Sequence, residues 1–278
     1  MNRLRRLNTK KVIITIIMFA IGLLFLMPFI WMLSASLKAE TNVFSYPIKW
    51  IPSDWKWDNY SRVWFGEQPF ILYYWNSIKV TVLTTLLSVT VSALAAYGFS
   101  KIHFKGRNAL FLIVLATFLI PAQAILVPQF MMYRVLNLFD THLGLILLNS
   151  FSVLGTFLLR QFFSSIQDDY IDAAKMDGAS HFTIFYKVVV PMMIPAISTY
   201  AILRFIWTWN DYQGPLIFLR SDHLSTIQLA IERFSTSSGE LYSLIMAGSV
   251  SAILPLIIIF IIGQKYVIEG IARGGVKG

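Results

Sequence analysis

The sequence predicts an all-α integral membrane protein with six transmembrane helices and with both termini in the cytoplasm. Hydrophobic residues make up 56% of the 278 residues and charged residues only 13%. This balance is far too apolar for a soluble domain of this size. Several uncharged stretches also reach the length of about 20 residues that a helix needs to cross a hydrocarbon core.

The chain is predicted to form one transmembrane domain, residues 1–278. Val12–Leu33, Ala109–Tyr133 and Leu241–Gly263 contain no charged residue and are each long enough to span. Three further stretches are less uniform: one is rich in Ser and Thr, one is short, and one contains Arg204. The expected spans are residues 12–33, 78–99, 109–133, 143–160, 189–212 and 241–264.

The first apolar stretch has some features of a signal peptide, because basic residues precede it and Ser34-Ala35-Ser36 follows. Its 22 residues exceed the roughly 7 to 15 of a cleaved hydrophobic region. We therefore expect it to be retained as the first span.

Lys and Arg are twice as frequent in the segments predicted to face the cytoplasm as in those predicted to face outward. This bias sets the orientation of membrane proteins. It also accounts for the net charge of +9 without a nucleic-acid partner, because the basic residues are spread over several loops. The chain has no cysteine, and its four histidines lack the spacing of metal ligands.

Residues 34–76 are predicted to form an outer loop that is too long for a simple turn and contains five tryptophans, four of them between residues 50 and 64. We expect either a small surface cap or a set of tryptophans anchored at the membrane interface.

A polar segment at residues 166–188 separates the fourth and fifth spans and carries the strongest local signals. Asp168 and Asp169 favour the start of a helix, where negative charge complements the helix dipole. Gly178 can end that helix in the left-handed conformation, and Ser180 is a suitable N-cap for a second helix reaching Lys187. Two prolines then lead into the fifth span.

This predicted helix-turn-helix has the composition of a docking surface. Ala173, Ala174 and Ala179 let another surface approach closely, and Asp172 and Asp177 offer charges to basic groups on it. We expect the 166–188 segment to fit a groove in a second protein.

The sequence contains no Gly-x-x-x-x-Gly-Lys-[Ser/Thr] phosphate loop and no recognisable catalytic constellation. We therefore expect no enzyme activity, no metal and no cofactor in this chain, and nucleotide chemistry would need a separate subunit.

A stripe of small hydroxyl residues recurs at helical spacing in the second span: Ser77, Thr81, Thr84, Ser88 and Ser92. Such a stripe favours close helix packing. The alternative is a polar wall of a solute path.

Arg204 is the most costly residue to place at membrane depth and needs a partner or water. Asn210, Asp211 and Tyr212 form a polar cluster at the outer end of the same span. These four residues either border a hydrophilic path or consist of a snorkelling arginine beside an ordinary polar helix end.

The polar segment resembles the cytoplasmic coupling loop of the ABC-transporter permeases of the binding-protein-dependent import class. The matching residues are Asp172-Ala173-Ala174, Asp177-Gly178-Ala179, Phe185, Val188, Pro191 and Pro195. The family motif usually opens with Glu, and the shorter Asp172 changes the reach of the charge. The resemblance implies that this loop docks into an ATP-hydrolysing subunit.

Further matches extend over most of residues 12–278 and are similar to the maltose-type, carbohydrate-importing branch. They are Asp58-Asn59-Tyr60, Ile120-Pro121 with Val127-Pro128, Leu136–Thr141, Trp207–Tyr212 with Pro215-Leu216-Ile217, and Gly274–Gly278. Gln213-Gly214 departs from the bulkier residues often found there.

The resemblance implies a subunit of the bacterial cytoplasmic membrane that translocates a carbohydrate, in the form of an oligosaccharide. Its implied partners are a homologous second permease, two ATP-binding subunits that hold ATP and Mg²⁺, an extracytoplasmic solute-binding protein and membrane lipid. The alternative from the residues alone is a gradient-driven secondary transporter or channel in which Arg204 and Asp211 couple ions. A membrane-embedded enzyme has no supporting motif.

Overall fold

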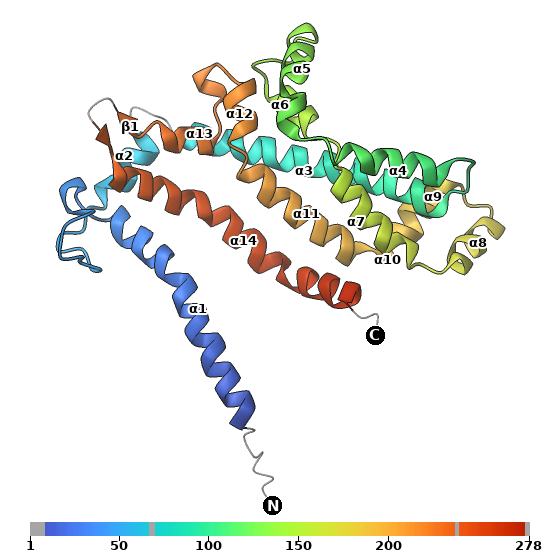
Figure 1. The fold of residues 1–278 in the computed structure, drawn as a ribbon, viewed down its shortest axis with the longest axis horizontal. Helices are drawn as coiled ribbons and strands as arrows, with labels where there is room; N and C mark the ends of the chain where they lie inside the picture. Colours follow the sequence, from blue (N-terminus) through green and yellow to red (C-terminus); the bar gives the residue numbers. More distant parts are fainter. Residues whose placement is uncertain (1–8, 67–69, 237–238, 276–278) are drawn as a thin grey trace, which may run out of the picture. The chain divides into compact units, whose positions relative to one another are not determined.

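The computed structural model describes residues 9–66, 70–236 and 239–275, and the chain is predominantly helical (Figure 1). The long helices are α1 (Thr9–Ser36), α3 (Phe70–Lys101) and α14 (Tyr242–Gly275). The shorter helices are α2 (Asp58–Phe65), α4 (Arg107–Thr117), α5 (Ala122–Val135), α6 (His142–Leu148), α7 (Val153–Ser164), α8 (Asp168–Met176), α9 (His181–Ile184), α10 (Val190–Met192), α11 (Ile194–Trp209), α12 (Gln213–Phe218) and α13 (Ile227–Glu232). Short 3₁₀ turns lie at Glu40–Asn42 and Asp222–Leu224, and a π-helical turn lies at Phe185–Val189.

One small feature departs from the all-α expectation. Strands β1 (Ser235–Thr236) and β2 (Gly239–Glu240) pair antiparallel, with Ser235 opposite Glu240. Each strand has two residues, so the pair closes a loop and leaves the helical class of the fold unchanged.

The chain divides into two compact units. Unit 1 comprises residues 1–70 and 231–253, and unit 2 comprises residues 71–230 and 254–278. The 166–188 segment and the Arg204 region both belong to unit 2.

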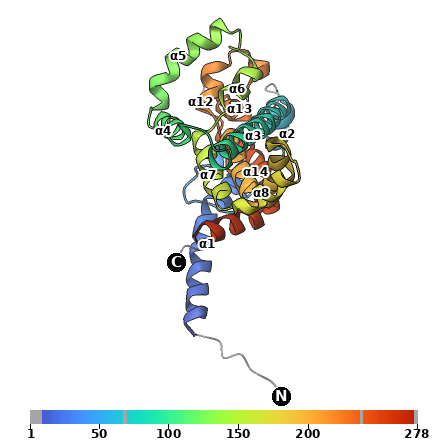
Figure 2. The ribbon, with the colours of Figure 1, turned by 90° about the vertical axis from the view of Figure 1, so that its right-hand side faces the viewer.

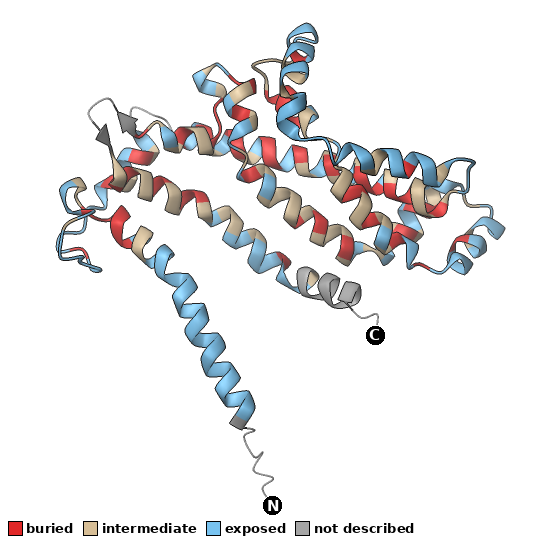
Figure 3. Cartoon of the chain, in the orientation of Figure 1, coloured by how far each residue is buried: buried red, intermediate tan, exposed pale blue. Residues whose placement is uncertain are grey.

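In unit 1, α1 exposes its apolar side chains along most of its length (Figure 3). Its most apolar window has a mean hydropathy of 2.8 and no buried residue. A soluble protein would pay heavily for this exposure, whereas lipid covers such a surface at no cost.

The loop that follows α1 in unit 1 is held by side chains that bond to backbone groups. The Asn59 amide donates to the carbonyls of Ser36 and Lys38, each at 2.9 Å. The Glu40 carboxylate accepts the backbone N–H groups of Tyr242 and Ser243 at 2.9 Å and thereby caps α14. The loop therefore has a defined conformation within this unit.

In unit 2, α3 presents one buried face and one exposed face (Figure 3). All five members of the predicted hydroxyl stripe are buried: Ser77, Thr81, Thr84, Ser88 and Ser92. The hydroxyls of Ser88 and Tyr200 lie 3.0 Å apart, and Ser77 accepts the backbone N–H of Ile227. In this conformation the stripe is used for helix packing.

Within the described residues, three helices are long and apolar enough to cross a membrane: Lys10–Ser36, Phe70–Lys101 and Tyr242–Tyr266. The other three predicted spans correspond to helix pairs that pass the same test together but are bent. α4 and α5 meet at 94° (Figure 2), α6 and α7 at 48°, and the helical run His181–Met192 meets α11 at 82°.

The bends have local causes. Pro121 sits at the N-cap of α5 with an extended backbone, which ends the preceding helical run. α6 and α7 are each restarted by a hydroxyl cap, because Thr141 accepts the N–H of Gly144 and Ser152 accepts that of Gly155, both at 3.0 Å. Apolar length therefore located these stretches, and Pro121, which as a proline is able to kink a helix, lies at the break before α5.

Candidate functional site

The 166–188 segment forms the predicted helix-turn-helix, which lies beside the C-terminal end of α3 (Figure 1). α8 begins at Asp168, as expected, and Gly178 adopts the left-handed conformation with φ 77°. Ser180 caps α9 by accepting the backbone N–H of Thr183 at 3.3 Å. These three sequence predictions are confirmed.

The second helix of the segment is shorter than predicted. α9 ends at Ile184, and a π-helical turn follows from Phe185 to Val189 in place of a regular helix through Lys187. The physical reason is Pro191, which has no N–H to donate to the carbonyl of Lys187 four residues earlier. A wider turn before a proline accommodates the unpaired carbonyl.

The outward face of the segment combines charge with exposed apolar side chains. Asp172, Ala173, Asp177 and Gly178 are exposed, and Asp172 pairs with Lys175 at 2.9 Å. Large apolar side chains are also exposed on the segment: Met176 is 88% exposed, Phe182 72%, Tyr186 66% and Tyr170 52%. Sequence reasoning had not singled out this apolar component.

The inward face of the segment belongs to the main core of unit 2. Ile171, Ile184 and Phe185 are buried with Tyr97 of α3 and Phe163 of α7, and Ala174 and Ala179 pack against the same cluster. Phe185 therefore lies in the core, and Pro191, at the start of α10, is exposed. The predicted coupling residues thus divide into an exposed group and a group that holds the segment on the core.

Two residues of α3 contact the segment directly, and sequence reasoning did not assign either of them a role. Lys101 donates to the Asp168 carboxylate and to the Ile166 carbonyl, each at 2.6 Å. The hydroxyl of Tyr97 lies 3.2 Å from Nδ1 of His181. The bond from Lys101 and its positive charge lower the pKa of Asp168. One available signal was the position of Lys101 immediately after an uncharged stretch.

Arg204 is linked to Asp211 through a third residue, Asn149, which connects α6 to α7. A terminal nitrogen of Arg204 donates to the Asn149 carbonyl at 2.6 Å. The Asn149 side chain in turn hydrogen-bonds to Asp211, and one oxygen of Asp211 accepts the N–H of Gly214 at 3.0 Å. Asp211 therefore caps the start of α12, a role that accounts for an aspartate here without a solute contact.

The same geometry explains the small residue after Asp211. A Cβ on Gly214 would lie 2.5 Å from an oxygen of the Asp211 carboxylate. The departure from bulkier residues at this position therefore permits the cap.

The structure places the four predicted path residues at two levels of burial. Arg204 and Asp211 are partly buried and joined through Asn149, whereas Asn210 and Tyr212 are exposed beside them. The Asn210 amide donates back to the Ile206 carbonyl at 2.9 Å.

Motif residues elsewhere in the chain hold loops together. Asp140 accepts the N–H groups of Arg220 and Ser221 at 2.8 and 2.9 Å and a bond from the Ser221 hydroxyl at 2.5 Å. These bonds lower the pKa of Asp140. Asn59 has the corresponding role in unit 1. The last three residues of the matched C-terminal motif, residues 276–278, lie outside the described part of the chain.

Comparison with known proteins decides the family. Residues 88–273 match the family model described as the binding-protein-dependent transport system inner membrane component. The chain belongs to this family. It is therefore a permease subunit located in the inner membrane, and the translocation role expected from the resemblance is confirmed.

Relatives of this permease align over nearly its whole length. It is 33% identical to the arabinooligosaccharides transport system permease protein of Bacillus subtilis, over 96% of each chain. It is 36% identical to the trehalose transport system permease protein of Mycobacterium tuberculosis, over 91% of this chain and 93% of that one.

A solved structure has the same fold as the permease. A chain of a bacterial ABC transporter involved in the import of the acidic polysaccharide alginate matches with a TM-score of 0.82 and 26% identity, covering 96% of this chain and 98% of that chain. The helical permease fold is therefore established.

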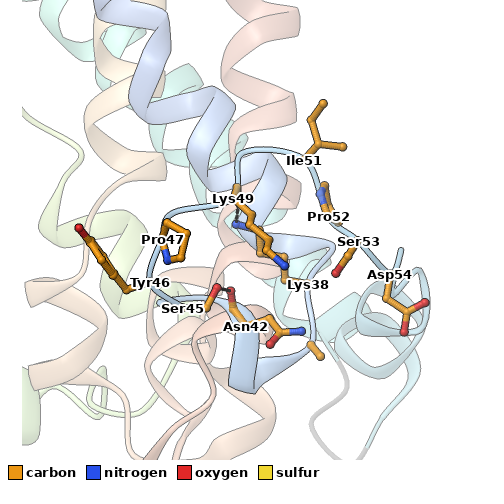
Figure 4. Close-up of a pocket in the computed structure, with 11 residues that line it drawn as sticks. Lys38, Asn42, Ser45, Tyr46, Pro47, Lys49, Ile51, Pro52, Ser53 and Asp54 are labelled. Carbon is orange, nitrogen blue, oxygen red and sulfur yellow. Dashed lines mark hydrogen bonds between the residues drawn. The ribbon is translucent and has the colours of Figure 1, made fainter.

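Unit 1 of the permease contains a cavity of about 200 Å³ in the loop that follows α1 (Figure 4). Lys38 at its edge donates to the Lys49 carbonyl at 2.6 Å and lies 4.2 Å from the centre of the Trp31 ring. These contacts hold the loop closed on itself. Among the residues that the structure describes, no three His, Cys, Asp or Glu side chains are grouped to hold a metal.

Proposed function

We propose that this permease imports a carbohydrate, in the form of an oligosaccharide, delivered by an extracytoplasmic solute-binding protein. The observation that carries the proposal is the near full-length similarity to permeases named for arabinooligosaccharides and trehalose. The fold shared with an alginate importer also supports a saccharide. A gradient-driven mechanism through Arg204 and Asp211 is less well supported, because Asp211 is used as a helix cap.

The proposed working unit contains this chain as one transmembrane domain, a homologous second permease and two ATP-binding subunits that bind ATP and Mg²⁺. Within this chain we propose six spans with both termini in the cytoplasm. Each bent helix pair would then count as one broken span, which membrane proteins tolerate where neighbouring protein satisfies the freed backbone groups.

We further propose that the 166–188 segment docks into an ATP-binding subunit. Its exposed face supplies two carboxylates, Asp172 and Asp177, for basic groups of the partner. Met176 and Phe182 supply apolar area that water covers in the free chain. A charged rim around apolar anchors is the usual composition of a protein interface.

For the solute path, we propose that Asn210 and Tyr212 border the translocated solute and that Arg204 and Asp211 shape the wall behind them. The two outer residues are exposed and can exchange hydrogen bonds with hydroxyl groups. Arg204 and Asp211 are partly buried and hydrogen-bond to Asn149 and Gly214, respectively.

Reconstitution of the complete complex in lipid vesicles tests the proposed function. ATP inside the vesicles and loaded binding protein outside should support uptake of a labelled oligosaccharide after proton and sodium gradients have been collapsed. Uptake that stops with the gradients while ATP stays high would favour the secondary transporter.

The Gly178→Ala variant tests the docking proposal, with Gly106→Ala as its matched control. Both glycines have a positive φ, 77° and 83°, and nothing lies within 4 Å of the place that a Cβ would occupy on either of them. Each substitution therefore introduces a similar backbone cost of about 1 kcal/mol. Only Gly178→Ala should weaken co-purification with the ATP-binding subunit and lower uptake per ATP hydrolysed. Equal behaviour of the two variants would contradict docking through this segment.

A further inference from the structure

We infer that the cytoplasmic end of α3 is fastened to the 166–188 segment at two points, and that Lys101 is the positioning residue that carries motion of the segment into α3. The inference rests on the proposed docking of this segment into an ATP-binding subunit. It adds a helix that the sequence does not connect to the segment, because the segment is covalently joined only to α7 and to the helices that lead into α11.

The first fastening is the contact between Lys101 and the start of α8. The Lys101 side chain is only 4% exposed, and its ammonium group bonds to Asp168 and to the Ile166 carbonyl. Burying an ammonium group is costly unless ionic and hydrogen-bonding partners are present. Any movement of α8 away from α3 would remove both partners, so the two elements are held to move together.

The second fastening lies at the start of α9, on the other side of the Gly178 turn. The Tyr97 hydroxyl is 3.2 Å from His181, and the Tyr97 ring contacts Phe185 with a centroid separation of 5.3 Å. Tyr97 and Lys101 are four residues apart and therefore lie on one face of α3. Both helices of the segment are thus held by the same helical face.

The same face of α3 continues toward other helices of unit 2. Ser88 contacts Tyr200 of α11 at 3.0 Å, and Ser92 lies 3.4 Å from the same hydroxyl. Ala93 and Ala96 of α3 share one core with Ile171, Ile184 and Tyr200. Displacement of the segment would therefore reach α11 through α3 as well as along the chain.

Lys101→Met and Asp168→Asn, each in the complete complex in vesicles, test this inference. Both should retain the ATP-binding subunit and ATP hydrolysis, while solute transported per ATP falls by between about twofold and thirtyfold, the range of coupling changes of 0.5 to 2 kcal/mol. Lys101→Arg keeps the charge and the donors and should restore most of the ratio. Lys105→Met, an exposed lysine in the next loop, should leave the ratio unchanged.

An unchanged transport ratio in Lys101→Met and Asp168→Asn would overturn the inference. So would loss of assembly in Lys101→Met with a normal ratio in Asp168→Asn, because Lys101 would then be needed only for folding. Gly178→Ala measured in the same vesicles separates the two proposals. If Gly178→Ala lowers the amount of solute transported per ATP and the Lys101 variants do not, the docking proposal is supported and the proposed role of Lys101 is contradicted.

A distance measurement tests the shared motion directly. Because this chain has no cysteine, spin labels can be placed at Leu94→Cys on the exposed face of α3 and at Asp169→Cys in α8, which are both exposed positions. Pulsed electron paramagnetic resonance should give the same distance between the two labels in the nucleotide-free complex and in the complex with ATP trapped in its ATP-binding subunits. A separation that changes by several ångströms would show that α8 moves independently of α3 and would overturn the inference.

Discussion

Gly155 of α7 lies against the ring of Tyr200 so closely that a Cβ at this position would overlap the ring. We predict that Gly155→Ala destabilises the permease by about 1 to 3 kcal/mol, the usual cost of overpacking a core. The thermal unfolding midpoint of the assembled complex should fall. Gly98→Ala is the control, because nothing lies within 4 Å of its Cβ, and it should be neutral or slightly stabilising.

Asp140 provides a pH-dependent contribution at the residue scale. Its bonds to Ser221 and Arg220 hold its pKa below the ordinary value of 3.8. A lowered native pKa means that the stabilisation is complete above the unfolded pKa and is lost as the pH falls through the native pKa. Asp140→Asn should therefore lower the free energy of unfolding by about 1 kcal/mol at neutral pH.

The difference between Asp140→Asn and the unsubstituted chain should shrink once the pH drops below about 4. Asp54→Asn is a suitable comparison, because Asp54 is 73% exposed and makes a surface ion pair with Lys56. A pH-independent difference for Asp140→Asn would contradict the assigned cause.

Some single-residue roles could be predicted from sequence and others could not. Asp168, Gly178 and Ser180 act through local backbone rules, and their positions in α8, the turn and α9 were predicted correctly. Lys101 and Asn149 act through partners 67 and 55 residues away in sequence. Such contacts depend on how helices pack, and residue spacing within one stretch carries no information about them.

At the element scale, the burial of the hydroxyl stripe of α3 favours a role in helix packing and not a role as the polar wall of a solute path. We predict that Ser88→Ala costs about 0.6 kcal/mol by removing its bond to Tyr200. The apparent KM for solute uptake should stay unchanged. Thr90→Ala, on the exposed face of the same helix, should alter neither quantity. A KM that rises in Ser88→Ala but not in Thr90→Ala would favour the alternative, in which the stripe lines a solute path.

Helices were predicted well where apolar length alone decides them and less well where a proline or a capping residue interrupts an apolar stretch. Apolar length located the stretches of α1, α3 and α14. Apolar length alone did not show the breaks before α5 and α11, because hydropathy does not record which backbone groups find partners. The π-helical turn before Pro191 is a similar case, since it reflects a missing donor and not a change in polarity.

At the scale of the whole molecule, the proposed topology can be tested by labelling. Single cysteines at Lys56 and at Lys175 should react on opposite sides of the membrane, because the outer loop and the 166–188 segment are proposed to face opposite compartments. A membrane-impermeant maleimide should label the Lys56→Cys variant in intact cells. It should label Lys175→Cys only after the membrane is opened.

The cysteine-free chain serves as the blank for this experiment. Labelling of Lys175→Cys in intact cells would place the 166–188 segment outside and would contradict the six-span arrangement. That outcome would also remove the proposed contact with an ATP-binding subunit.

The exposure of α1 also has a consequence for how the chain can change over evolutionary time. Its apolar window has no buried residue, whereas 39% of the corresponding window of α3 is buried. Within this polypeptide, α1 therefore has few shape requirements, and exchanges among Leu, Ile, Val, Phe and Met should drift there almost freely. α3 must conserve side-chain volume, so variation among descendants of this gene should accumulate first in the N-terminal helix.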